Sequence, residues 1–73
     1  MNANELKAFG LTEEEINATD AANPSNWDRD LVEKLVADYE DPKVAARRAK
    51  RSGPGIERAR KLYEARKFYL SQN

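Results

Sequence analysis

The clearest chemistry in this sequence lies in basic side chains that recognise anions: Arg47, Arg48, Lys50, Arg51, Arg58 and Lys61. Arginine and lysine neutralise phosphates and carboxylates, and an arginine can also read guanine edges in a major groove. The first four crowd one turn region, and the other two continue along the segment that follows. These residues therefore predict binding of an anionic partner.

No pattern in the sequence predicts catalysis. The chain has no Cys and no His, which excludes a thiolate zinc site, a cysteine nucleophile and a histidine base. Glu13, Glu14 and Glu15 could be mistaken for cation ligands, but consecutive carboxylates on a helix point in different directions. The serines occupy positions typical of helix caps or of the chain end, so they do not indicate nucleophiles. We expect no catalytic residue, no metal ligand, no cofactor and no small-molecule substrate, so we interpret the protein as a binding protein rather than an enzyme.

Charge is sorted by position along the chain. Residues 1–41 hold eleven acids and three bases, a balance of −8, and residues 42–73 hold ten bases and two acids, a balance of +8. The basic half favours a polyanionic partner, and the acidic half favours either a second surface or an internal counterweight. Exposed pairs within one helix, such as Glu57 with Lys61, contribute only about 0.3–0.5 kcal/mol each, so they do not explain ten bases.

The sequence predicts that short helices position these side chains. Seventy-three residues make one domain, 1–73, of a size that buries only about 60% of its unfolded surface. We find no strand-like alternation and no repeat. The expected fold is all-α, a small bundle of three to five short helices. No leader peptide or membrane span is expected, so we expect a cytoplasmic protein without a membrane partner.

Helix starts and stops are marked in the first half of the chain. A first helix over residues 4–9 is expected to end at Gly10. Thr12 and Glu15 form a capping box, with Leu11 and Ile16 placed for a hydrophobic staple. This second helix is expected to end near residue 19, before a connector that closes at a proline.

A longer helix is expected to be capped by Ser25 or Asn26 and to run to about residue 40. Its apolar stripe is Trp27, Leu31, Leu35 and Tyr39, together with Val32 and Val36. Asp41-Pro42 then predicts a break, since proline starts a new helix and disfavours helical geometry in the residue before it. A core is expected among these residues: Leu6, Phe9, Leu11, Ile16, Trp27, Leu31, Leu35, Tyr39, Ile56, Leu62, Tyr63 and Leu70.

Residues 42–70 form a helix-turn-helix candidate, with an alanine-rich helix, a turn at residues 52–55 and a last helix to about Leu70. Close crossing of the two helices needs small residues, which Ala45, Ala46 and Ala49 supply on the first helix, with Ile56 and Ala59 facing them on the second. The run 45–52 resembles the amino-terminal helix-turn-helix of phage terminase small subunits, with Lys50 in place of a glycine and Arg51 in place of an aromatic residue. That resemblance implies a DNA-binding motif. An ordinary helical hairpin explains the same pattern.

Trp27 and Tyr39 have two explanations. Both fit the apolar stripe of a core helix, and both are residue types enriched at binding hot spots. If the basic half were only a counterweight, the partner-binding surface would lie around these two aromatics.

The chain resembles the small phage-encoded regulators of bacterial RNA polymerase, of the Xanthomonas-phage type. The resemblance rests on its small size, its lack of Cys and His, its opposed charge halves and its degenerate helix-turn-helix. The resemblance implies binding to host polymerase, hindered promoter-complex formation and terminator read-through. Two alternatives stay open. One is a helix-turn-helix DNA-binding protein, either packaging-related or a repressor, that binds nucleic acid through the basic half. The other is a structural adaptor.

Overall fold

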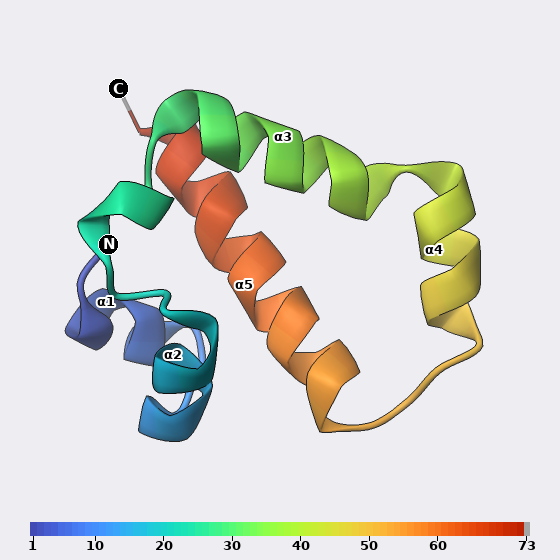
Figure 1. Cartoon of the computed structure of the whole chain (residues 1–73), viewed down its shortest axis with the longest axis horizontal. Coiled ribbons are helices and arrows are strands. Elements are labelled where there is room, and N and C mark those ends of the chain that lie inside the picture. The colour runs from blue at the N-terminus through green and yellow to red at the C-terminus, as the bar shows by residue number, and fades with distance from the viewer. Residues whose placement is uncertain (73) are drawn as a thin grey trace.

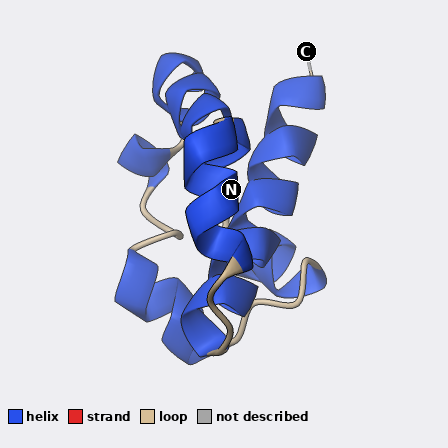
Figure 2. Cartoon of the chain, turned by 90° about the vertical axis from the view of Figure 1, so that its right-hand side faces the viewer, coloured by secondary structure: helices blue, strands red, loops and turns tan. Residues whose placement is uncertain are grey.

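The computed structural model describes residues 1–72 and forms a small all-α bundle. Five helices and one short 3-10 turn follow each other in the order α1 (Ala3–Ala8), α2 (Glu13–Thr19), η1 (Pro24–Asn26), α3 (Arg29–Glu40), α4 (Pro42–Ala49) and α5 (Pro54–Ser71). Short loops join them (Figure 2). The expected all-α class is confirmed. Within residues 1–72, no helix combines the length and the hydropathy that a membrane crossing requires.

α2 begins as the sequence predicts, whereas α1 begins one residue earlier than expected, at Ala3 after its cap Asn2. The Thr12 amide donates to Glu15 Oε1 at 2.9 Å, and the Glu15 amide donates to Thr12 Oγ1 at 3.1 Å, which is a complete capping box. Leu11 and Ile16 are both buried. Gly10 has a φ of +92°, a conformation that strongly favours glycine. The local signals were therefore sufficient to define this part of the fold.

The start of α3 differs from the expectation. Ser25 and Asn26 do not cap it but lie in η1, where Pro24 occupies the first position. The cap is Asp28, whose carboxylate accepts from the Leu31 amide at 3.3 Å. Because of this 3-10 turn, the cap of α3 lies two or three residues later than expected. Trp27 therefore lies in the connection before α3, where its side chain is buried in the core.

The core lies where α1, α2 and the connection before α3 meet α3 and α5. Its buried members are Leu6, Leu11, Ile16, Ala21, Trp27, Val32, Leu62 and Ala65. The stripe expected on α3 is rotated, because Val32 is fully buried and Val36 packs against the core, whereas Leu31 is 36% exposed. Leu35 and Tyr39 lie outside the buried core. With α3 beginning at Arg29, its packing on α5 turns the face that carries Val32 inward.

The break between α3 and α4 is confirmed. Asp41 is extended, with a φ of −57° and a ψ of 128°, and its Oδ1 accepts from the Lys43 amide at 2.8 Å and from the Val44 amide at 3.4 Å. Asp41 thus ends one helix and caps the next.

Replacing Asp41 by alanine should lower the free energy of unfolding by about 0.5–2 kcal/mol, because the amides at the start of α4 lose their acceptor. Thermal melting followed by circular dichroism measures this loss. Asp38→Ala, on the exposed surface of α3, is the matched control and should change stability less. Equal melting of the two variants would contradict a capping role for Asp41.

α4 packs against α3 but not closely against α5 (Figure 1). The expectation of a tight crossing lined by alanines is therefore wrong, since Ala46 and Ala49 are exposed and Ala45 is only half-buried. The chain turns at Asp41-Pro42 and places α4 at the far end of α3, and residues 50–53 then lead away to α5. The helix-turn-helix order is present along the chain, but its two helices stand apart.

Candidate functional site

The space between α4 and the start of α5 is a groove of about 310 Å³, which we call the α4–α5 groove. Its lining consists of four apolar or aromatic residues and three arginines: Tyr39, Val44, Ile56, Ala59, Arg47, Arg48 and Arg51. The apolar members are half-buried, whereas Arg47 and Arg51 are exposed. The site therefore combines an aliphatic lining with accessible positive charge.

An aromatic column fixes one wall of the groove. The Arg48 guanidinium lies 3.6 Å from the centre of the Tyr39 ring, and Arg48 Nη1 donates to the Tyr39 carbonyl at 3.0 Å. The Tyr63 ring stacks on Tyr39 with centroids 4.1 Å apart and 15° between the planes. Two groups this close to one ring lie on opposite faces of it, so both faces of Tyr39 are covered.

The column continues to α5 and is tied to α3 by a hydrogen bond. Lys67 Nζ lies 5.2 Å from the centre of the Tyr63 ring. The Tyr63 hydroxyl donates to Glu40 Oε2 at 2.6 Å, and this bond to a carboxylate raises the pKa of Tyr63. Arg48 is thereby held in a fixed position relative to α3 and α5, although α4 itself has no buried residue.

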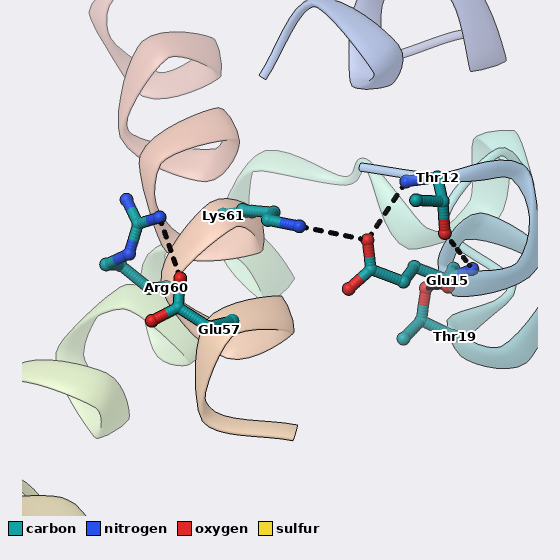
Figure 3. A network of polar contacts seen from close by, with 6 residues as sticks. All are labelled: Thr12, Glu15, Thr19, Glu57, Arg60 and Lys61. Atoms are coloured by element: carbon teal, nitrogen blue, oxygen red, sulfur yellow. Dashed lines mark hydrogen bonds and ion pairs between the residues drawn. The ribbon is translucent and has the colours of Figure 1, made fainter. Parts of the chain in front are cut away.

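Two bases of α5 form ion pairs with acids of the same chain (Figure 3). Lys61 Nζ lies 3.1 Å from Glu15 Oε1 at the start of α2, and Arg60 Nη2 lies 3.0 Å from Glu57 on its own helix. Arg58 is half-buried, and burial lowers the pKa of the Arg66 guanidinium. α5 therefore does not present its bases as one free row.

Unlike the two paired bases of α5, most bases at the end of α4 and just after it are free of contacts with acids in the part of the chain that the structure describes. Arg47, Lys50 and Arg51 are exposed, and within residues 1–72 none of them takes part in an ion pair. Among the ion pairs of that part of the chain, Lys61–Glu15 alone joins the acidic half to the basic half. Direct pairing between the halves thus leaves the positive charge at the α4–α5 groove uncompensated.

Trp27 lies apart from the groove. It is only 8% exposed, its Nε1 donates to the Ala21 carbonyl at 2.6 Å, and the Tyr69 ring meets it edge-on with centroids 5.4 Å apart. The Tyr69 hydroxyl also donates to the Trp27 carbonyl. Trp27 joins the connection before α3 to the end of α5, so little of its ring is accessible to a partner.

The six basic residues singled out in the sequence are therefore divided by the structure. Arg47, Arg48 and Arg51 line the groove. Lys50 is exposed on the same segment without lining it, and Arg58 and Lys61 are half-buried on α5. The sequence indicated the basic cluster but not the groove beside it, because the alanines of α4 were expected to pack against Ile56 and Ala59 of α5.

The Glu15–Lys61 pair gives stability a pH dependence. The hydrogen bond from the Thr12 amide, and next the one from Lys61, lower the pKa of the Glu15 carboxyl. A lowered pKa in the folded state stabilises the fold above the unfolded-state pKa, and this stabilisation is lost as the pH falls through the folded value. Glu15→Gln should therefore melt below the parent at neutral pH and closer to it in acid.

Melting temperatures at about pH 7 and about pH 3 measure this effect. Glu14→Gln, an exposed neighbour on the same helix, is the matched control. A constant difference between Glu15→Gln and the parent at both pH values would contradict the assignment.

Within residues 1–72, no group of three or more Asp or Glu side chains is arranged to hold a metal ion. The chain matches no family model, no curated protein and no solved structure. The geometry of the site is therefore the basis on which a function can be proposed.

Proposed function

We propose that this protein is a non-enzymatic, phage-type transcription regulator that binds bacterial RNA polymerase through the α4–α5 groove and the exposed arginines that line it, Arg47 and Arg51. In this proposal it hinders initiation, promotes read-through of terminators and acts in the cytoplasm of a bacterial host. The observation that supports a protein partner most directly is the aliphatic lining of Val44, Ile56 and Ala59 beside Arg47 and Arg51. The choice of polymerase follows the resemblance in size and charge pattern.

Three observations favour a protein partner over DNA. A helix-turn-helix reads a major groove with a second helix braced by the first, and here α4 and α5 stand apart. The bases on α5 are largely half-buried or paired within the molecule. Both faces of Tyr39 are covered, which removes the stacking platform that single strands use.

DNA binding is the second candidate function, and the exposed bases Lys43, Arg47, Lys50 and Arg51 favour it. Contacts of this kind with phosphates would make affinity fall steeply with salt. A DNA-binding protein would also shift a free duplex, whereas the regulator would need polymerase.

In vitro transcription with purified bacterial RNA polymerase tests the proposal. Adding the protein before promoter binding should reduce transcripts, and adding it to elongating complexes should increase read-through of a terminator. Lys50→Glu, which removes a base outside the groove, should act like the parent. No change in either assay at saturating protein would overturn the proposed function.

A further inference from the structure

We propose that the α4–α5 groove binds an acidic, amphipathic peptide segment of the partner, with apolar side chains against Val44, Ile56 and Ala59 and carboxylates against Arg47 and Arg51. This inference deepens the proposed function and rests on it, because it names the chemistry of the segment that the site would recognise.

The aliphatic lining calls for apolar side chains. Val44 comes from α4, and Ile56 and Ala59 come from α5; all three are half-buried and face the same groove. Its volume of about 310 Å³ is at the lower end of the roughly 300–1,000 Å³ of ligand sites. The groove therefore has room for a few side chains of a segment that runs along the surface, not for a whole helix.

The arginines favour a segment that carries carboxylates beside its apolar side chains. Arg47 and Arg51 are exposed and unpaired within residues 1–72, and a planar guanidinium binds a carboxylate through two parallel hydrogen bonds. Arg48 adds a third positive charge, already held in place on the Tyr39 ring. Alternating charge and apolar surface matches an acidic amphipathic segment.

A neighbouring hollow favours a segment over a small molecule. It lies along the turn 52–55, has a volume of about 480 Å³ and shares Arg51 and Ile56 with the groove. Because they share two lining residues, the two hollows are neighbours on the surface beside the end of α4. A peptide several residues long can reach both hollows, whereas a compact ligand would occupy one of them.

Nucleic acid fits this lining less well. A phosphate chain gains nothing from Val44, Ile56 and Ala59. Bases find no free face on Tyr39, because Arg48 and Tyr63 cover both sides of its ring. Binding of nucleic acid in the groove is therefore an outcome that the experiment must be able to detect.

Fluorescence anisotropy with a labelled short peptide tests the inference directly. The probe peptides carry glutamates and place leucines on one helical face or in alternation. Companion peptides replace all leucines by serine or all glutamates by lysine, and a short single-stranded DNA and a duplex complete the set. We expect binding of a leucine- and glutamate-containing peptide at physiological salt and weak or no binding of the companions and the DNAs.

Variants then locate the binding. Ala59→Phe fills the groove without changing charge, and Val44→Ser removes its methyl groups without adding bulk. Each should weaken binding of the peptide and of purified polymerase roughly tenfold, whereas Lys50→Glu should not. Circular dichroism shows which variants keep the helical fold, and Val44→Ser provides the result if Ala59→Phe does not fold.

The outcomes separate this inference from the proposed function. Peptide binding without any polymerase binding would support the groove assignment and overturn the proposed function. Polymerase binding that folded Val44→Ser and Ala59→Phe both leave unchanged would overturn the groove assignment and leave the proposed function standing. Equal binding of the serine companion, or DNA binding that Ala59→Phe weakens, would overturn the amphipathic specificity proposed for the groove.

Discussion

Replacing Arg47 and Arg51 together by glutamate should weaken binding to RNA polymerase about a hundredfold or more. Both side chains line the α4–α5 groove, both are exposed, and neither is paired with an acid within residues 1–72. Reversal therefore removes two attractive contacts and adds repulsion toward the carboxylates that the groove is proposed to bind. Exposed substitutions usually change stability by only about 0.5 kcal/mol, so the helical fold should persist.

Surface plasmon resonance with purified polymerase measures the effect, and Lys50→Glu is the matched control. It makes the same charge change on the same segment, but Lys50 does not line the groove. Acids near the end of α4 also oppose its macrodipole, so circular dichroism must show normal helical content. Parent-like affinity of the folded double variant would show that the basic cluster is not the partner surface.

Replacing Trp27 by alanine should lower the free energy of unfolding by about 3–5 kcal/mol, the range for large aromatic residues in a core. The ring is nearly buried, and its Nε1 satisfies the Ala21 carbonyl. Whole domains are stabilised by only about 5–15 kcal/mol, and small ones lie at the low end. Much of the Trp27→Ala population should therefore be unfolded near physiological temperature.

Thermal melting followed by circular dichroism measures this loss, because the variant has no tryptophan left for fluorescence. Trp27→Phe keeps a ring but loses the hydrogen bond to Ala21, so it should cost less. Leu31→Ala, at a large but partly exposed residue of α3, should also cost less. Melting of Trp27→Ala within a few degrees of the parent would mean that the ring is not a core residue.

The features that the sequence predicted correctly depend on neighbours along the chain. The Thr12–Glu15 capping box, the turn at Gly10 and the break at Asp41-Pro42 each involve residues no more than a few positions apart. Backbone sterics and capping hydrogen bonds fix them before any tertiary contact forms. Local chemistry was enough for the order of the helices and for most of their ends.

The features that the sequence did not predict depend on distant contacts. Lys61 and Glu15 are 46 residues apart, and periodicity could not pair them. The choice of Val32 over Leu31 for the core followed from how α3 packs on α5. The most consequential error concerned Ala46 and Ala49, since small residues are compatible with a tight crossing but do not require one. The groove exists because that crossing did not form.

Only part of the proposed site could be predicted from the sequence. The clustering of Arg47, Arg48 and Arg51 was apparent, and it is the basis on which an anionic partner is predicted. The stack of Arg48 on Tyr39 was not, because nothing in the spacing of nine residues across a helix break indicates contact. That stack is what sets the arginine beside the aliphatic lining and covers the tyrosine face.

The basic half is proposed to recognise a protein, bacterial RNA polymerase, rather than DNA. The most direct measurement is binding of the immobilised protein to nuclease-treated, purified polymerase and to a free duplex in parallel, at physiological salt. Polymerase should bind, and the duplex should not. Ala59→Phe and the Arg47→Glu, Arg51→Glu double variant should both weaken the binding of polymerase. Tight binding of the duplex with no binding of polymerase would contradict it.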